Sequence, residues 1–358
     1  MIKRYEHNPI LSTKDIKPSQ DGFVVECVLN PGVFTFEGKV WLILRIAERP
    51  VQKIGTISFP FNNGDNQVEI MEFDVEDPEI DLSDSRVIKY DGQSYLTTMS
   101  HLCLVCSDDG INFYEPQHLP TRIFGMGSQE TYGIEDCRVN CIDGEYLLTY
   151  TQVSPYGVGV GLMRTRDWRN IQREGMIFAP HNKDCCIFQE KIGDSYYALH
   201  RPSGVDLGGN FIWISSSPDL IHWGHHTCVL TTRPGQWDCA RVGAGAAPIK
   251  TPLGWLEIYH GADYNHVYHL GAILLDLNDP SKVLARSVEP ILSPEMDYEK
   301  TGFFGNVVFS NGHVVHDDEI TLYYGASDEV ICFGILKISD VLNSLEPQLA
   351  LNIASNHR

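Results

Sequence analysis

The sequence predicts an all-β chain folded into one β-propeller, with a pocket on the propeller axis and a short helix near the C-terminus. Two observations predict this fold. A unit of apolar strand, polar turn and aromatic-rich strand returns about every 50–60 residues, which is typical of blades of about four strands each. No strong helical period precedes the C-terminus, and a β-sandwich would not explain the regular spacing.

The clearest copies of this unit cover residues 85–96 and 137–147, and they place Arg86 and Arg138 52 residues apart. Looser copies begin near Val33, Ile187, Ala247 and Val307. These copies allow five or six blades, because a small propeller often closes one blade with strands from both ends of the chain.

A second motif, a turn that contains an aspartate, follows a similar spacing. It occurs at residues 107–110, 165–168, 217–220 and 277–280. Residues 338–345 then have the pattern of a short capped helix. Because the copies run from about residue 30 to about residue 330 without a linker, we expect one propeller domain over residues 1–358. Length alone would suggest two domains.

Charge and composition restrict the function classes. A net charge of −20 disfavours nucleic acid and anionic membranes as partners, because binding to either relies on lysine and arginine. The sequence has no apolar run of about 18 residues that would span a bilayer. It also begins without the apolar segment of a signal peptide. We therefore expect a cytoplasmic protein without membrane contact.

The cysteines and histidines do not indicate a metal or redox centre. Ten cysteines in 358 residues are expected to be mostly buried small side chains in a reducing compartment. Cys103 and Cys106 form a CxxC that stands alone inside an apparent strand. His260, His266 and His269 are closely spaced, but no further ligand set supports a metal site. We expect neither a metal nor an organic cofactor.

One copy of the unit carries a charged set that the other copies lack: Glu135, Asp136 and Arg138. Asp136 is either the centre of an active site or a turn residue paired with Arg138. Cations near the strand ends of other copies favour an active site, because equivalent strand ends of a propeller converge on its axis. These cations are Lys183, Arg201 and Arg241. Arginine and lysine gathered around a pocket suit an oxyanion such as phosphate.

Several motifs resemble glycoside hydrolase family 130, which contains β-mannoside phosphorylases and a smaller group of β-1,2-mannosidases. In chain order, they lie at residues 133–139, 198–203, 241–245, 254–261, 297–309 and 323–328. The resemblance covers nearly the whole chain and implies a five-bladed propeller. It implies a mannose-containing oligosaccharide and inorganic phosphate as substrates. Members often self-associate, so a homo-oligomer is allowed, although the sequence has no interface signature.

The resemblance also implies roles for individual residues. Asp136 matches the general acid of the family. The sugar-side positions are matched by Asn30 and Arg45, which hold the mannosyl unit, and by Arg138 and Asp328. The phosphate-side positions are matched by Arg201, Arg241 and His260, joined by Tyr268 and Lys183. The sequence departs from the usual motif at Cys137, where proline or alanine is common, and this change should affect packing more than chemistry.

The reaction that the resemblance implies is inverting phosphorolysis of a β-mannoside, such as β-1,2-mannobiose or oligomannan, to α-mannose 1-phosphate. Asp136 would protonate the departing oxygen, directly or through a substrate hydroxyl. Phosphate held by the cations would attack the opposite face of the sugar. Because Asp136 must carry a proton when it acts, we expect its pKa to be raised.

Two alternatives stay open from the sequence. An inverting β-1,2-mannosidase needs a second carboxylate to activate water, and Glu257 with Glu299 could supply it. A non-catalytic propeller that binds an acidic peptide would need no acid catalyst. The linkage also stays open between β-1,2 and β-1,4.

Overall fold

The computed structural model describes residues 1–347 except 64, 66, 85 and 205–207. This part of the chain is nearly all β, which confirms the predicted class. Its helical segments are a 3-10 turn at Thr13–Asp15, α1 at Asp297–Lys300 and α2 at Ile338–Asn343. α2 lies where the C-terminal helix is predicted. No helix among the described residues is long and apolar enough to cross a membrane. Residues 348–358 of the predicted domain lie outside the described residues.

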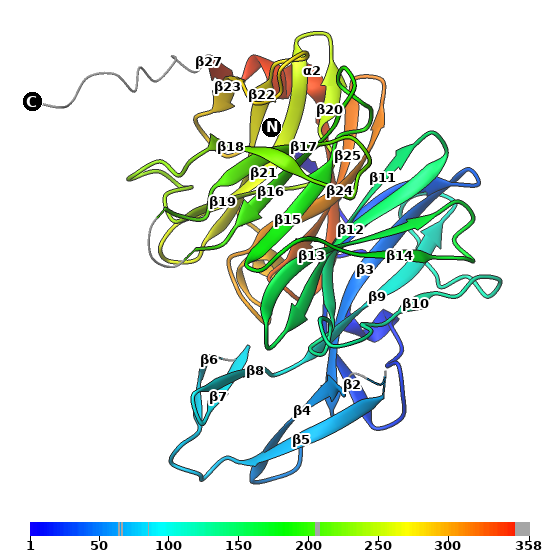
Figure 1. Cartoon of the computed structure of the whole chain (residues 1–358), viewed down its shortest axis with the longest axis vertical. Helices are drawn as coiled ribbons and strands as arrows, with labels where there is room; N and C mark the ends of the chain where they lie inside the picture. The colour runs from blue at the N-terminus through cyan, green and yellow to red at the C-terminus, as the bar shows by residue number, and fades with distance from the viewer. Residues whose placement is uncertain (64, 66, 85, 205–207, 348–358) are drawn as a thin grey trace, which may run out of the picture.

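Two four-stranded antiparallel sheets occupy the middle of the chain (Figure 1). The first contains β11 (Ile134–Ile142), β12 (Glu145–Ser154), β13 (Gly157–Thr165) and β14 (Gln172–Phe178). The second contains β15 (Asn182–Ile187), β16 (Tyr196–Pro202), β17 (Ile212–Ser217) and β18 (Gly224–Leu230). Strands that follow one another in sequence are neighbours in both sheets, as in blades built from successive hairpins.

The third sheet has the order β19–β21–β22–β23–β27, and β20 pairs with β21 beside this path. Its strands are β19 (Arg241–Ala244), β20 (Ile249–Thr251), β21 (Gly254–Ala262), β22 (Tyr268–Leu275), β23 (Val283–Ser287) and β27 (Leu345–Pro347). β27 follows α2 and pairs with β23, so the chain returns to the outer edge of this sheet.

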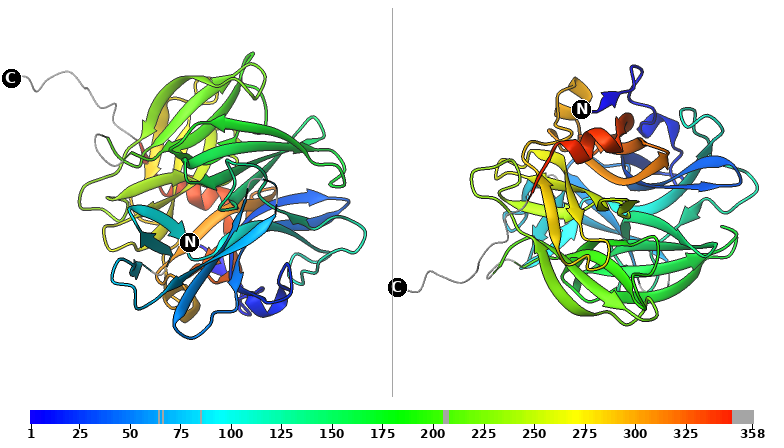
Figure 2. Two further views of the ribbon diagram at one scale, coloured as in Figure 1. Left: turned by 60° about the horizontal axis from the view of Figure 1, so that its bottom comes forward. Right: turned by 90° about the horizontal axis from the view of Figure 1, so that it is seen from above.

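The fourth sheet joins strands from both ends of the chain, in the order β1–β26–β25–β24–β2–β3–β9–β10. Its strands are β1 (Lys3–Arg4), β26 (Val330–Lys337), β25 (Glu319–Ala326), β24 (Val308–His316), β2 (Phe23–Phe36), β3 (Lys39–Pro50), β9 (Met99–Ser107) and β10 (Arg122–Ile123). Two antiparallel halves meet at β2 and β24, which pair in parallel at Gly32 and Asn311. The N-terminal β1 pairs with β26, beside the last strands of the chain (Figure 2).

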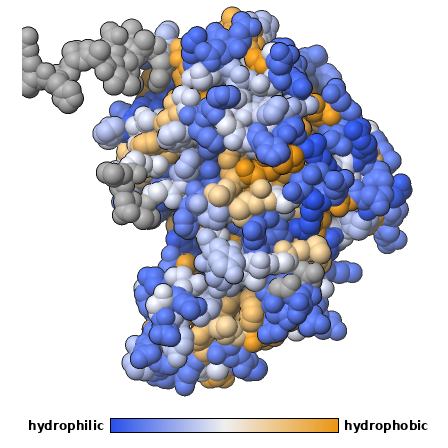
Figure 3. Space-filling model, in the orientation of Figure 1, coloured by the Kyte–Doolittle hydropathy of each residue, from blue (hydrophilic) through white to orange (hydrophobic). Residues whose placement is uncertain are grey.

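Residues between β3 and β9 form an arm outside these four sheets, at the bottom of Figure 1. The arm contains a hairpin, β4 (Thr56–Asn62) and β5 (Val68–Asp74), and a small sheet, β6 (Asp81–Asp84), β7 (Val87–Tyr90) and β8 (Gln93–Leu96). Figure 3 shows apolar side chains at this end of the molecule, where Val68 and Ile70 are exposed. The interpretation of residues 85–96 as a copy of the blade unit is therefore wrong. Similar turn residues form a hairpin here, but outside the repeated sheets.

The other copies of the unit are confirmed as hairpins of the four large sheets: β2–β3, β11–β12, β15–β16, β20–β21 and β24–β25. Inner strands of different sheets contact one another, β2 with β11, β11 with β15, and β15 with β19, and β2 also lies against β24 inside the fourth sheet. Apolar rings fill the space between sheets; Phe34 stacks on Trp168 with ring centroids 4.0 Å apart. Sheets that meet through their first strands around a common centre form a β-propeller.

The predicted aspartate turns are confirmed after β9, β13 and β17. Oδ1 of Asp109, Asp167 and Asp219 accepts hydrogen bonds from the backbone N–H groups two and three residues later. This side-chain bond mimics a backbone turn and closes each hairpin in the same way. Near Asp279 the acceptor is Asp276 instead, which receives the N–H groups of Asn278 and Asp279.

The position of β1 predicts that its residue Arg4 contributes to the stability of the fold. Arg4 on β1 donates to Glu299 in α1, at 2.7 Å from Nε to Oε1, and Glu299 is fully buried. Arg4→Ala should lower the free energy of unfolding by about 2–3 kcal/mol, because it leaves a buried carboxylate with one partner fewer while Arg4 itself is partly solvated. Chemical denaturation would measure the change, with Lys3→Ala, an exposed neighbour on the same strand, as control. Equal small changes in the free energy of unfolding for both variants would contradict this role of Arg4.

Candidate active site

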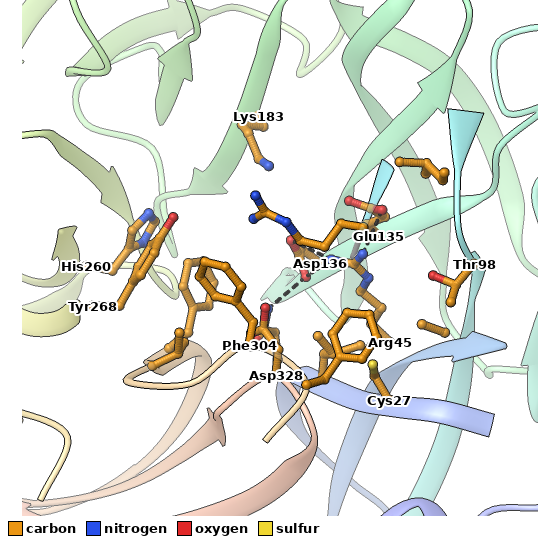
Figure 4. Close-up of a pocket in the computed structure, with 18 of the residues that line it drawn as sticks. Cys27, Arg45, Thr98, Glu135, Asp136, Lys183, His260, Tyr268, Phe304 and Asp328 are labelled. Carbon is orange, nitrogen blue, oxygen red and sulfur yellow. Dashed lines mark hydrogen bonds and ion pairs between the residues drawn. The ribbon is translucent and has the colours of Figure 1, made fainter. Parts of the chain in front are cut away.

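A pocket of about 310 Å³ opens where the first strands of the sheets meet. The predicted residues that line it are Asn30, Arg45, Asp136, Lys183, Arg201, Arg241, His260, Tyr268 and Asp328. They come from all four large sheets, so the fold brings together side chains that are up to about 300 residues apart in sequence. In Figure 4, Asp136 lies between Arg45 on one side and His260 with Tyr268 on the other.

Asn30, Asp136 and Asp184 occupy matching places in the first strands of their sheets. Each lies at a β-bulge, where the register shifts, and each has a positive φ, of 36°, 48° and 53° respectively. Asparagine and aspartate tolerate this left-handed conformation better than other side chains except glycine. A bulge also re-aims the side chain it carries, and all three residues line the pocket.

Asp136 is only 4% exposed, and hydrogen-bond donors surround it. Asn30 Nδ2 donates to Asp136 Oδ1 at 3.1 Å, and Arg45 Nη1 lies 3.3 Å from the same oxygen. Burial alone would raise the pKa of Asp136, but the charges of Arg45, Lys183 and Arg138 outweigh it and hold the pKa below its ordinary value. The predicted raised pKa is therefore wrong for the arrangement of the protein's own residues.

Two further carboxylates lie on this side of the pocket. Glu135 accepts a hydrogen bond from Arg45 Nη2 at 2.7 Å, and Arg45 Nε donates to Ser100. Burial raises the pKa of Asp328 to about 6, against the charge of Arg45 and with help from the nearby Asp136. Asp328 therefore takes up a proton at a higher pH than Asp136 does.

Asp184 organises the opposite side of the pocket. Its Oδ2 lies 3.1 Å from Arg201 Nε and 3.3 Å from His260 Nε2. Burial lowers the pKa of His260 to about 4, although Asp184 acts in the opposite direction. The imidazole is therefore neutral at pH 7, and the positive charge on this side comes from Arg201 and the neighbouring cations.

Arg241, Tyr268 and Lys183 complete the cationic side. Arg241 Nη1 donates to the Tyr268 hydroxyl at 2.9 Å. Arg241 Nε is buried and has no hydrogen-bond partner among the described residues. Lys183 points toward the space above Asp136 in Figure 4. A buried guanidinium donor without a partner, beside two further cations, suits a bound oxyanion.

Arg138 is not among the described residues that line the pocket, so we revise its predicted sugar contact. It is 3% exposed and makes an ion pair with Asp184 Oδ1 at 3.2 Å. It also donates to the backbone carbonyls of Asp136, Ala244 and Gly245. Arg138 therefore positions the strands around Asp136 from behind the pocket.

Glu257 and Glu299, the predicted water-activating pair, also lie away from the described pocket lining. Glu257 is fully buried, and its Oε1 accepts a hydrogen bond from the Gly245 N–H at 2.8 Å. Burial raises the pKa of Glu257 well above its ordinary value. Glu299 accepts hydrogen bonds from Arg4 and from the Tyr324 hydroxyl. Both carboxyls are thus engaged in holding the protein backbone and the N-terminal strand.

The structure places Glu135 of the charged set in the pocket and adds four residues for which the sequence predicts no site role: Asp184, Arg86, Phe303 and Phe304. Asp184 could have been found from its neighbour Lys183 and from its match to Asp136 at the bulge. Arg86 could not, because its segment has the sequence pattern of a blade copy but belongs to the arm. Its guanidinium lies over the Phe304 ring, 4.5 Å from the centroid.

The closely spaced histidines and the cysteines of the sequence lie in different environments in the structure. His269 Nδ1 lies 3.0 Å from Ser293 Oγ, whereas His260 faces Asp184. All ten cysteines are free, and Cys103 and Cys106 are buried in β9. Across the part of the chain that the structure describes, no group of three histidine, cysteine, aspartate or glutamate side chains is placed to hold a metal ion.

The buried Glu257 predicts a pH effect on stability. A carboxyl whose pKa is raised on folding stabilises the protein below the ordinary value of 4.5, and this contribution is lost as pH rises, because the unfolded chain ionises and the folded chain does not. Glu257→Gln does not titrate and keeps an acceptor for Gly245, so its stability relative to wild type should rise between about pH 5 and pH 8. Denaturation midpoints at both pH values would test this, with the exposed Glu76→Gln as control. A variant that loses stability at pH 8 would mean that Glu257 is ionised.

Comparisons with known proteins identify the family of the chain. Residues 85–347 match the family model for glycoside hydrolase family 130, described as β-1,4-mannooligosaccharide phosphorylase. The chain is 44% identical over 351 residues to the β-1,2-mannobiose phosphorylase of Listeria innocua, covering 96% of this chain and 98% of the relative. A 1,2-β-oligomannan phosphorylase of Thermoanaerobacter is 44% identical over 250 residues, covering 68% of this chain and 80% of that protein. The structure of the Listeria innocua enzyme in complex with β-1,2-mannobiose matches with a TM-score of 0.92 at 43% identity, over 96% of this chain and 98% of that one. The chain therefore belongs to glycoside hydrolase family 130.

Proposed function

We propose that this protein cleaves β-1,2-linked mannosides by inverting phosphorolysis and releases α-mannose 1-phosphate. The observation that carries the proposal is the cluster of Arg201, His260 and Arg241, which lies across the pocket from Asp136 and includes an unpartnered buried guanidinium donor. The names of the two relatives that are 44% identical support phosphorolysis and the β-1,2 linkage.

Each side of the pocket has its own task in this reaction. Arg45 and Asn30 hold the sugar beside Asp136. Asn30 Oδ1 is a buried acceptor without a partner among the described residues, and it accepts a hydrogen bond from a sugar hydroxyl. Arg201 and Arg241, with Tyr268 and Lys183 beside them, hold phosphate so that an oxygen reaches the anomeric carbon from the face opposite the leaving oxygen. Positioning and charge stabilisation supply most of the rate enhancement in such a site.

Asp136 acts as the general acid and must acquire a proton that its own surroundings do not favour. Phosphate brings negative charge next to Arg201 and Lys183, and this charge opposes the cations that lower the pKa of Asp136. Substrate binding also removes the remaining water around the carboxyl. The pKa of Asp136 therefore rises when both substrates occupy the pocket, so that protonation accompanies assembly of the reactive complex.

Hydrolysis has less support, because Glu257 and Glu299 are both engaged in structural hydrogen bonds.

We also propose that the propeller has five blades. The eight-stranded sheet then counts as two blades, β2–β3–β9–β10 and β24–β25–β26–β1, and the three other large sheets are one blade each. We propose that phosphate is the co-substrate and that the reaction uses no metal or organic cofactor. A cytoplasmic location and a homo-oligomer also stay predictions.

Asp136→Asn tests the role of the acid. Asparagine tolerates the positive φ at this bulge, so the fold should persist while phosphorolysis falls by a factor of about 10²–10⁴. The assay is release of α-mannose 1-phosphate from β-1,2-mannobiose, followed by phosphorus and proton NMR with and without phosphate. In the wild type, the rate should fall as pH rises, because the acid loses its proton.

The control for this variant is Asp143→Asn, in the exposed turn between β11 and β12. Wild-type activity in Asp136→Asn would remove the catalytic role. Release of free mannose at the same rate without phosphate would mean that the protein is a mannosidase.

Arg241→Lys tests the phosphate site. The lysine keeps the charge but loses the forked donors of the guanidinium, so KM for phosphate should rise about tenfold, equivalent to about 1.4 kcal/mol. KM for β-1,2-mannobiose should change much less. The exposed Arg169→Lys serves as control. A rise in KM for the sugar alone would place Arg241 on the sugar side instead.

A further inference from the structure

A buried network of charged and aromatic side chains lies next to the cationic side of the pocket. We call it the brace, and it consists of Arg233, Trp237, Asp238, Tyr259 and Arg286. Asp238 and Tyr259 are fully buried, and Arg286 is almost fully buried. No member of the brace is among the described residues that line the pocket, so direct contact with a substrate does not explain the network.

Asp238 is the centre of the brace. Its Oδ2 accepts hydrogen bonds from Arg233 Nη2 at 2.7 Å, from Arg286 Nη2 at 2.5 Å and from the Tyr259 hydroxyl at 2.8 Å. Arg286 Nε also donates to the Tyr259 oxygen at 3.0 Å. Burial raises the pKa of the Tyr259 hydroxyl, which therefore carries no charge, so two guanidinium groups around one carboxylate leave the brace with a net positive charge. Because a buried carboxylate is stable only with such partners, the network fixes the position of Asp238.

Trp237 holds residues 231–240, the segment that connects β18 to β19, against the strands β21 and β22. Its ring stacks on the ring of Tyr259, with centroids 5.6 Å apart. A Cβ atom at Gly261 of β21 would lie 2.6 Å from the Trp237 ring, and one at Gly271 of β22 would lie 2.5 Å from it. Glycine at both positions therefore makes room for the indole, and the segment packs directly on the two strands.

Two residues of the cationic side adjoin the brace in the chain. Arg241 comes three residues after Asp238, at the start of β19, which pairs with β21. His260 follows Tyr259 on β21. Because successive side chains of a strand point to opposite faces, His260 faces the pocket while Tyr259 faces the brace. The brace therefore holds both strands that present these pocket residues.

We propose that Asp238 and Tyr259 are positioning residues for phosphate. Through the brace they fix the places of Arg241 and His260 and thereby set the affinity of the pocket for phosphate. This inference rests on the proposed function, of which phosphate binding is a part. Arg241 donates to the Tyr268 hydroxyl, but its buried Nε has no partner among the described residues, so its position depends on the strand that carries it. Small displacements of a group that holds a reactant are costly in such sites.

Tyr259→Phe tests the brace with a change that keeps the ring. It removes the hydroxyl that connects Asp238 to Arg286, so KM for phosphate should rise about three- to tenfold, whereas KM for β-1,2-mannobiose and kcat at saturating phosphate should stay within about twofold of wild type. Tyr150→Phe is the matched control, because the Tyr150 hydroxyl donates to another buried carboxylate, Glu130, at 2.8 Å, and neither is among the described residues that line the pocket. An equal KM for phosphate in the two variants would overturn the proposal.

Asp238→Asn separates an effect of position from an effect of charge. The change keeps the shape of the side chain but removes a negative charge near the phosphate side, so an effect of charge alone would tighten phosphate binding. Loss of position should instead weaken phosphate binding about fivefold or more. Glu130→Gln, which removes the carboxylate beside Arg173, is the matched control. Tighter phosphate binding by Asp238→Asn would overturn the proposal, and Tyr259→Phe decides the question if Asp238→Asn does not fold.

Calorimetry with inorganic phosphate separates this inference from the proposed function. In the absence of sugar, it measures phosphate binding whether or not the protein turns over. Weaker binding by Tyr259→Phe than by Tyr150→Phe would support the brace even if wild type released no α-mannose 1-phosphate. Equal binding by the two variants would reject the brace and leave phosphorolysis intact, whereas a wild type that does not bind phosphate would reject both.

Discussion

The buried ion pair between Arg138 and Asp184 holds the centre of this propeller together. Both side chains are almost fully buried, at 3% and 1% exposure, and a buried pair is stable only when its remaining donors and acceptors are also satisfied. Arg138 meets that condition by donating to carbonyls of β11 and of the end of β19, while the second oxygen of Asp184 faces Arg201 and His260. Burial alone would raise the pKa of Asp184, but the surrounding cations hold it well below its ordinary value. One ion pair therefore connects three sheets and both sides of the pocket.

This connection has a chemical consequence. The bulge that presents Asp136 and the guanidinium of Arg201 share one buried support, so their relative position is fixed by strands of the sheets. The charges of Arg45, Lys183 and Arg138 hold the pKa of Asp136 low. In the proposed mechanism, protonation of Asp136 accompanies substrate binding, and the neutral His260 adds hydrogen bonding without adding charge.

The arm between β3 and β9 modifies a repeated scaffold at one place. It adds no strand to the four large sheets, yet it supplies Arg86, Val87 and Leu96 to the wall of the pocket. Strands of the propeller carry most of the charged side chains of the pocket, whereas the arm supplies part of the pocket wall.

The sequence by itself determined the features that depend on local pattern. The spacing of hairpins predicted an all-β propeller, the aspartate turns at Asp109, Asp167 and Asp219 followed from side-chain to backbone bonding, and the charged set at Asp136 identified the centre of the site. Only the tertiary structure decided the role of residues 85–96, the removal of Arg138, Glu257 and Glu299 from the pocket lining, and the direction of the Asp136 pKa shift. Burial and electrostatic environment arise from segments far apart in the chain: Arg45, Lys183 and Asn30 act on Asp136 only because three sheets meet there. A short sequence motif identifies a titratable group, but the residues around that group in space determine its pKa.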